Sequence, residues 1–190
     1  DHAYLRQTTA PGGTFLPLDA EHPPERLAAM SQDAAPRFVL ADAHTGAALR
    51  RLDGAAKFDI IEVPADGGAM PTGAVPEVPE LVQPGHVAYL IFTSGTTGVP
   101  KAVQLLHAGL ANHVRWMNAT LGLADEDRVL HKTSISFDAS IWEFFSPLAC
   151  GAQIVLAPPD AHRDMQRLVE TLHAEGVSVV QFVPSEMRVV

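Results

Sequence analysis

The first third of the chain alternates between short apolar runs and polar segments. Residues 37–41 and 58–63 are two such runs, the second rich in β-branched side chains, and each is expected to form a buried strand. Residues 25–32 are expected to form a helix, because Pro23 and Pro24 precede them and proline is tolerated in a first helical turn. The pattern therefore predicts strands and helices in alternation.

The strongest strand signal lies at residues 86–92, where the apolar run is uninterrupted. Such runs are typical of strands covered on both faces. A polar, glycine-rich loop is expected at residues 93–101, and a second strand at 102–106 would complete a hairpin around it. Residues 107–121 place apolar side chains near helical spacing and are expected to form a helix.

The second half of the chain repeats this alternation. Strands are expected at residues 129–132, 153–157 and 177–183, and helices at residues 140–148 and 164–175. Alternating strands and helices are typical of an α/β fold, in which a layered, largely parallel sheet is flanked by helices. We therefore expect this fold class.

The chain is expected to be one partial domain spanning residues 1–190. Residues 1–84 would be an upstream α/β segment that ends in a proline- and glycine-rich connection at 64–84, and residues 85–190 would hold the candidate chemistry. The sequence does not begin with Met, and a further helix is expected to start near Ser185. These features predict an incomplete fold.

Charge and composition exclude several classes of function. Acidic residues outnumber basic ones, 22 to 13, and no Lys/Arg cluster is present, so no nucleic-acid partner is expected. No apolar run reaches the length of a membrane span. Cys150 is the only cysteine, which excludes a disulfide within the chain and fits a cytoplasmic location. The histidines show no metal-ligand spacing, and we expect no resident metal site.

The loop at residues 93–101 has the composition of a phosphate-binding turn. Gly95 and Gly98 permit positive φ angles and a close approach of a ligand to the backbone, whose N–H groups can then surround an anion. Lys101 adds a positive charge where a leaving pyrophosphate would develop negative charge. The hydroxyl groups that can donate to phosphate oxygens belong to Thr93, Ser94, Thr96 and Thr97.

Two familiar phosphate motifs do not fit this loop. Val99 and Pro100 separate Gly98 from Lys101, whereas a Walker loop requires Gly-Lys-Ser/Thr in succession. The glycine spacing also differs from a dinucleotide fingerprint. From composition alone, a flexible turn between two strands remains the alternative.

The longer string from Ile91 to Lys101 closely resembles the phosphate-loop signature of one superfamily of adenylate-forming enzymes. That superfamily comprises acyl-CoA synthetases, luciferases and the adenylation domains of nonribosomal peptide synthetases. Ala102 stands where the family usually has glycine. The resemblance implies that the loop binds the β- and γ-phosphates of ATP, with Lys101 as a catalytic residue and with ATP and Mg²⁺ as cofactors.

A second segment, from Lys132 to Phe145, resembles the substrate pocket of peptide-synthetase adenylation domains. The resemblance implies that Asp138 pairs with the α-ammonium of an amino acid, a group that fatty and aryl acids lack. The resemblance also implies that Phe137, Ala139 and Trp142 bind the substrate. A small residue and an indole favour an uncharged, fairly large side chain such as that of Phe or Leu.

Local sequence leaves structural alternatives open at these positions. Asp138 precedes an expected helix, and aspartate is a favoured N-cap. Trp142 and Phe144 have the ordinary alternative of core packing.

The flanking segments Gly12–Asp19, Pro158–Asp164 and Gln181–Ser185 also resemble the family, so the resemblance spans nearly the whole chain. It implies part of the large N-terminal subdomain of an ATP-dependent amino-acid-activating enzyme of secondary metabolism. The implied reaction forms aminoacyl-AMP and pyrophosphate, before the acyl group passes to the phosphopantetheine thiol of a peptidyl carrier domain.

The remainder of the adenylation domain is therefore an implied partner. The later motifs of the family would lie past Val190, so the chain alone is expected to lack normal adenylation activity. Two other functions stay open, namely part of an acyl- or aryl-acid:CoA ligase and a noncatalytic binding module derived from such a domain.

Overall fold

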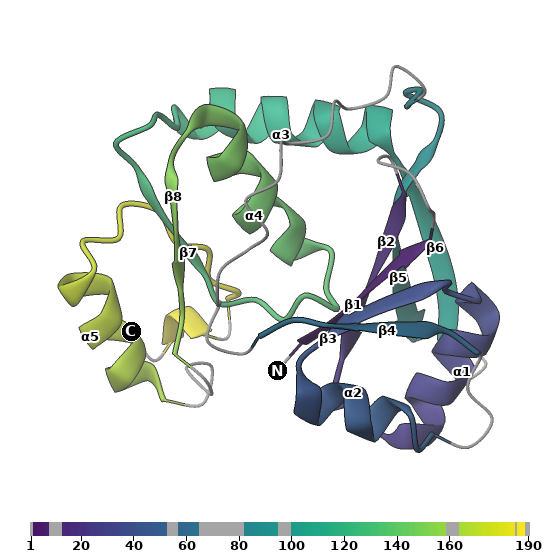
Figure 1. Ribbon diagram of the computed structural model, residues 1–190. Coiled ribbons are helices and arrows are strands. Elements are labelled where there is room, and N and C mark those ends of the chain that lie inside the picture. Colours follow the sequence, from purple (N-terminus) through teal and green to yellow (C-terminus); the bar gives the residue numbers. More distant parts are fainter. Residues whose placement is uncertain are drawn as a thin grey trace. The chain divides into compact units, whose positions relative to one another are not determined.

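The computed structural model describes residues 2–7, 13–52, 57–64, 82–94, 100–158, 164–184 and 186–188. The chain divides into two compact units, residues 1–110 and 111–190. Each unit contains its own sheet, with six strands in the first unit and two in the second (Figure 1).

The sheet of the first unit has the strand order β4-β3-β1-β2-β5-β6. β2 pairs with β5, and β3 with β4, in parallel. The pairs β1–β2, β1–β3 and β5–β6 are antiparallel. The strands are β1 (His2–Gln7), β2 (Thr14–Asp19), β3 (Phe38–Ala41), β4 (Asp59–Glu62), β5 (Val87–Ser94) and β6 (Pro100–Leu106).

Two helices, α1 (Pro24–Ala34) and α2 (Ala43–Leu49), contribute to one core cluster with this sheet. Leu27 and Met30 of α1 are buried in the cluster, as is Leu49 of α2. The strands contribute Leu16, Leu18, Val39, Ala41, Leu90 and Phe92. Because both helices share this cluster, they cover the same face of the sheet.

The second unit is built on a β-α-β arrangement. β7 (Arg128–His131) and β8 (Gln153–Leu156) run parallel and are joined through α4 (Ala139–Cys150). Helix α3 (His107–Leu121) starts before the boundary between the units, and α5 (Met165–Ala174) and the short 3₁₀ helix η1 (Glu186–Arg188) follow β8.

Helices α4 and α5 lie on opposite faces of the β7–β8 pair (Figure 1). Side chains alternate along a strand. Leu130 accordingly packs with Leu168 of α5, whereas His131 contacts α4 through Glu143. Both faces of β7 are therefore covered, which explains why Val129, Leu130 and His131 are all buried.

The expected α/β class is confirmed, and each helix and strand expected from residue 25 to residue 175 is present with small shifts at its ends. The six-stranded sheet is mixed, with more antiparallel pairing than a largely parallel sheet would have, because short connections such as the β5–β6 hairpin reverse the chain. The expected connection at 64–84 lies mostly outside the described residues.

The strand expected at residues 177–183 is wrong. Only an isolated parallel bridge, between Val129 and Val179, is present there. Beyond it, the Val183 N–H donates to the Glu186 carboxylate, and the Val183 carbonyl accepts from the Glu186 N–H. These bonds begin η1 and occupy the backbone groups that a strand would need.

Helix α2 is short and depends on its N-cap. The carboxylate of Asp42 accepts hydrogen bonds from the N–H groups of His44 and Thr45 at 2.8 and 3.0 Å and from the Thr45 hydroxyl at 2.7 Å. The bond from the Thr45 N–H has the largest effect on the pKa of Asp42, and the bond from the Thr45 hydroxyl the next largest. Both hold this pKa below its ordinary value.

This cap predicts a pH-dependent contribution to stability. A depressed pKa in the folded state means that the stabilisation is complete above the unfolded pKa of about 3.9 and is lost as the pH falls through the folded value. Asp42→Ala is expected to lower the free energy of unfolding by about 1 kcal/mol at pH 7. Urea titrations should show a smaller difference between variant and wild type at pH 2.5. Exposed Asp33 provides the control, Asp33→Ala, and an equal loss at both pH values would contradict the prediction.

The core of the second unit supplies a second prediction. Leu168 is fully buried against Leu130 and Val155, whereas Leu148 on α4 is 65% exposed. Leu168→Ala is expected to lower the free energy of unfolding by about 2–5 kcal/mol, because it removes buried methyl groups and leaves a cavity. Leu148→Ala should change it by less than about 0.5 kcal/mol. Similar losses in urea unfolding for both variants would show that α5 is not packed as described.

Candidate functional site

The β5–β6 hairpin brings two of the predicted phosphate-binding residues together. Thr93 is paired directly with Lys101, and the last pair before the turn is Ser94 with Pro100. Residues directly opposite each other in an antiparallel pair have Cβ atoms about 4.5–5.5 Å apart. The hairpin expected around this loop is therefore confirmed, and its paired ends hold Thr93 and Lys101 side by side.

Burial along β5 explains why the chain changes character at this point. The residues from Ala88 to Phe92 are all buried, and the next residue, Thr93, is exposed, as is Lys101 opposite it. β5 is therefore buried as far as Phe92, and its exposed, polar end begins at Thr93. The remaining predicted residues of the loop, Gly95, Thr96, Thr97 and Gly98, lie outside the described residues.

The predicted substrate-binding residues lie in the second unit, at the start of α4. Phe137 is 65% exposed, Asp138 is exposed and Ala139 is the first residue of the helix. The Asp138 side chain makes no capping hydrogen bond, and its backbone is already helical, with φ −59° and ψ −31°. The hydroxyl of Ser140 donates to the Phe137 carbonyl instead. The structure therefore does not support the N-cap alternative for Asp138.

Trp142 is buried, one turn further along α4. Its indole N–H donates to the side-chain oxygen of Gln181, which sequence reasoning had not singled out. Phe144 is half-buried, and its ring centroid lies 3.9 Å from that of His131. Core packing therefore describes both aromatic side chains, and Gln181 fixes the orientation of the indole.

Sequence reasoning also missed Glu143, whose side chain is fully buried. Its Oε2 accepts from the N–H groups of Lys132 and Thr133 at 3.2 and 3.1 Å and lies 2.8 Å from Nδ1 of His131. Its Oε1 accepts from the Thr133 hydroxyl at 2.6 Å. The sequence feature that could have pointed to Glu143 is that it is the single acidic residue within the otherwise apolar run Ile141–Phe145.

Lys132 also has a carboxylate partner for its side chain. Its Nζ lies 3.0 and 2.8 Å from the two carboxylate oxygens of Glu186 and 5.4 Å from the ring centroid of Phe182. The lysine side chain is 6% exposed and that of Glu186 20%. This largely buried ion pair connects the end of β7 to the start of η1.

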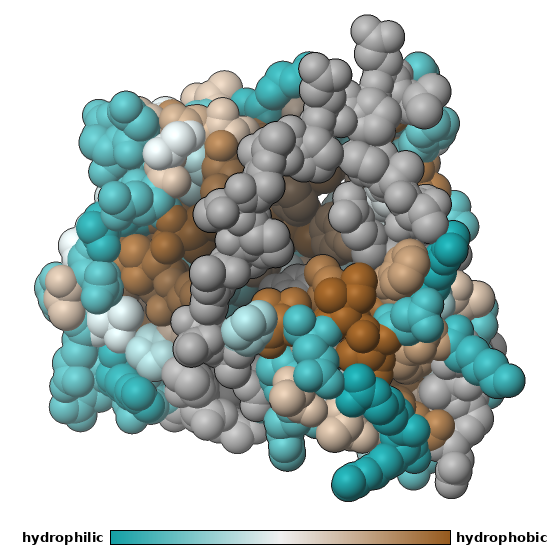
Figure 2. All heavy atoms as spheres, viewed as in Figure 1, coloured by the Kyte–Doolittle hydropathy of each residue, from teal (hydrophilic) through white to brown (hydrophobic). Residues whose placement is uncertain are grey.

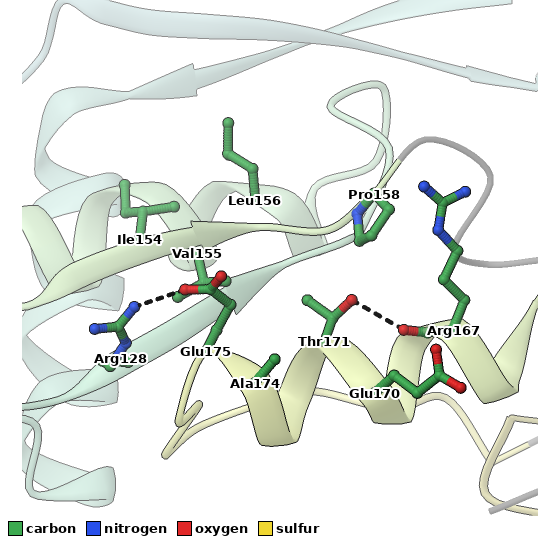
Figure 3. A pocket seen from close by; sticks show the side chains of 10 residues that line it. All are labelled: Arg128, Ile154, Val155, Leu156, Pro158, Arg167, Glu170, Thr171, Ala174 and Glu175. Carbon is green, nitrogen blue, oxygen red and sulfur yellow. Dashed lines mark hydrogen bonds and ion pairs between the residues drawn. The ribbon is translucent and has the colours of Figure 1, made fainter.

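A hollow of about 580 Å³ lies between the β7–β8 pair and α5 (Figure 3). Arg128 and Glu175 form an ion pair at 2.9 Å on its wall, and Leu156 of β8 is 69% exposed. Hydrophobic side chains also gather at the surface over β8 (Figure 2). None of the predicted site residues lines this hollow.

Asp127 supports the start of β7. The Ala124 N–H and the Ser178 hydroxyl both donate to its carboxylate. These two bonds, of which the first has the larger effect, hold the pKa of Asp127 below the ordinary value.

Across the described residues, no group of three or more His, Cys, Asp or Glu side chains is placed to hold a metal ion. In the same part of the chain, no helix is long and apolar enough to span a membrane.

Comparisons with known proteins agree with this geometry. The sequence profile of the family described as AMP-binding enzyme matches residues 9–190. Tyrocidine synthase 3 of Brevibacillus parabrevis is 41% identical over 179 residues, which are 94% of this chain and 3% of that protein. Enterobactin synthase component F of Escherichia coli O157:H7 is 40% identical over 174 residues, 92% of this chain and 13% of that protein. The chain thus spans a small part of these relatives.

Solved structures of the nonribosomal peptide synthetase FmoA3 (S1046A) have the same fold. The form bound to α-methyl-L-serine-AMP has a TM-score of 0.76 and 30% identity, over 92% of this chain and 19% of that one. The AMPPNP-bound form has the same score and identity, over 91% and 18% of the two chains.

The matched region includes both the β5–β6 hairpin and the start of α4, where the predicted phosphate-binding and substrate-binding residues lie. The chain therefore belongs to the AMP-binding enzyme family, and within it resembles the adenylation domains of nonribosomal peptide synthetases.

Proposed function

We propose that this chain contributes the ATP-phosphate loop and the amino-acid-binding segment of an adenylation domain. In the proposed reaction, the carboxylate of an amino acid attacks the α-phosphorus of ATP, the bond to the β-phosphate bridging oxygen breaks, and aminoacyl-AMP and pyrophosphate form. The acyl group then passes to the phosphopantetheine thiol of a peptidyl carrier domain. Catalysis of this kind rests on positioning and charge stabilisation and needs no side-chain nucleophile.

The observation that supports this proposal most directly is the state of Asp138. Its carboxylate is exposed at the start of α4 and is not used as a helix cap. A carboxylate in this position can accept a charge-assisted hydrogen bond from an ammonium group, which fixes both the position and the orientation of an amino acid. Phe137, Ala139 and Trp142 are the neighbouring residues proposed to contact its side chain.

The buried indole of Trp142 bears on the proposed substrate. Its only hydrogen-bond donor is already directed to Gln181. Although the indole is packed in the core and only 4% exposed, a ligand that reached its ring would meet an apolar surface. Together with the small Ala139, this surface suits an uncharged, fairly large side chain such as that of Phe or Leu.

The phosphate side of the proposed site is the β5–β6 hairpin. Thr93, Ser94, Gly95, Thr96, Thr97 and Gly98 are proposed to bind the phosphates through hydroxyl and backbone N–H groups. Lys101 stands opposite Thr93 with an exposed side chain, so its ammonium is free to approach a phosphate from the hairpin stem. Its role would be to balance the charge that develops on the leaving pyrophosphate.

Magnesium would be a companion of ATP in this proposal, since it bridges phosphate oxygens and offsets their charge. The part of the chain that the structure describes has no group of three or more His, Cys, Asp or Glu side chains placed to hold a metal ion. The remainder of the adenylation domain is proposed as the structural partner. The single cysteine fits the proposed cytoplasmic location.

ATP binding tests the phosphate side. Isothermal calorimetry is expected to show that the chain binds Mg·ATP and that Lys101→Ala weakens binding about 10-fold, the effect of losing one charge-assisted hydrogen bond. Asp138→Asn should leave ATP affinity within about twofold of wild type, because its proposed partner is the amine. Lys57→Ala removes another exposed lysine of the first unit and serves as the control. A folded chain that binds no ATP would contradict the proposal.

Amino-acid binding tests the second unit separately. With AMPPNP present, L-phenylalanine or L-leucine is expected to bind more tightly than the matching acid that lacks the amino group. Asp138→Asn should weaken amino-acid binding by at least about 10-fold and leave the deaminated acid unaffected. Asp125→Asn, at another exposed position, is the control. A preference for the deaminated acid would favour an acyl- or aryl-acid:CoA ligase, and binding of neither compound would favour a noncatalytic module.

A further inference from the structure

Glu143 has no place in the reaction described above, and its burial requires an explanation. A carboxylate withdrawn completely from water loses several kcal/mol of hydration unless donors replace it. Glu143 lies at the second turn of α4, within the same helix that begins beside Asp138. Its partners all belong to the three residues where β7 ends and the loop to α4 begins.

The hydrogen bonds around this carboxylate are complete. Two backbone N–H groups, the Thr133 hydroxyl and the ring of His131 surround it, at distances from 2.6 to 3.2 Å. The N–H groups and the hydroxyl are donors, and His131 donates when Nδ1 bears the proton. An ionised carboxylate only accepts, so the ionised form of Glu143 satisfies every partner.

These bonds close the base of the loop that bears Asp138. The loop leaves β7 at Lys132 and enters α4 at Asp138, and Glu143 joins its first residues to the helix that follows it. Inside the loop, the Phe137 N–H donates to the Ser134 carbonyl at 2.9 Å, and the side chain of Ile135 is buried. The path from the end of β7 to Asp138 is therefore fixed at its base and along its length.

We propose that Glu143 is the positioning residue for Asp138. Its buried carboxylate fastens the end of β7 to α4 and thereby sets where the Asp138 carboxylate stands. The effect of Glu143 on substrate binding rests on the proposed function, because it requires that Asp138 binds an amino acid. The attachment of the loop to α4 does not depend on that function.

Two substitutions separate the hydrogen bonds of Glu143 from its volume. Glu143→Leu keeps most of the volume and removes every acceptor. Glu143→Gln can place its amide oxygen toward the Lys132 and Thr133 N–H groups and its NH₂ toward the Thr133 hydroxyl, which can also accept. The glutamine variant should therefore behave nearly as wild type. Glu126→Leu, at an exposed position of the same unit, is the matched control.

Amide hydrogen exchange of the 190-residue chain tests the fastening directly. In Glu143→Leu, the Lys132 and Thr133 amides are expected to exchange at least about 30-fold faster, because each loses a buried acceptor. The Ala157 amide, bonded to the His131 carbonyl, reports whether the β7–β8 pair is intact, and the Leu130 amide, bonded to the Val179 carbonyl, reports on the contact between β7 and Val179. If the leucine variant does not fold, Thr133→Val removes the hydroxyl bond alone, and about 5-fold faster exchange is expected for the backbone amide of residue 133.

Affinity distinguishes positioning from a purely structural role. Glu143→Leu is expected to weaken L-phenylalanine binding at least about 10-fold, to leave Mg·ATP and the deaminated acid within about twofold, and to be rescued by glutamine. Unchanged exchange at Lys132 and Thr133 would overturn the proposal. The proposal would also be overturned if Glu143→Leu made both amides exchange faster but left amino-acid affinity unchanged, while Asp138→Asn weakened that affinity. A wild-type chain that binds no amino acid would refute the proposed function, while exchange would still decide whether Glu143 fixes the loop.

Discussion

A carboxylate that is removed from water must be surrounded by donors, and around Glu143 this requirement dictates the path of the main chain. The helix supplies the charge, and the end of β7 supplies the N–H groups of Lys132 and Thr133. A rotation or translation of α4 against β7 would separate them and leave a buried charge without partners, which is among the most costly defects in a folded protein. The position of Asp138, at the first turn of that helix, follows from this constraint.

The phosphate side of the proposed site depends on a different kind of interaction. The register of the β5–β6 hairpin is held by main-chain hydrogen bonds and by the buried run from Ala88 to Phe92. The run is buried on both faces of β5, so the main-chain pairing with β6 specifies which residues lie opposite each other. Lys101 stands opposite Thr93 as a result. Backbone geometry therefore organises this side, and a buried side chain organises the segment that bears Asp138.

The elements that sequence predicted well are those in which burial and hydrogen bonding coincide. The apolar run of β5 and the periodic pattern of α3 are examples. Helix α2 was not predicted because its pattern is weak, and it forms through the Asp42 cap and a close approach to the sheet at Gly46. A Cβ there would lie 3.3 Å from Ile60. The prediction of a strand at residues 177–183 was wrong because burial and strand pairing do not coincide there. Val177, Val180 and Phe182 are apolar because they pack against the Leu130 cluster, whereas the backbone bonds of Ser178 and Val179 to β7 do not extend into a strand.

The same distinction explains which site residues a sequence reveals. Lys101 and Asp138 stand within long motifs, because the residue types that bind phosphate and ammonium recur in a fixed order. Two of the partners of Glu143 are backbone N–H groups, which every residue except proline possesses, so these two partners leave no trace in the sequence.

Lys132 shows how far this support extends. Its backbone is held by Glu143, while its ammonium is held by Glu186, more than fifty residues later in the chain. Two carboxylates, both from later in the chain, therefore hold one residue, one through its backbone and the other through its side chain, and each is costly to bury without its partner. The position of the Asp138 loop is accordingly determined by the second unit as a folded whole, which no local motif can encode.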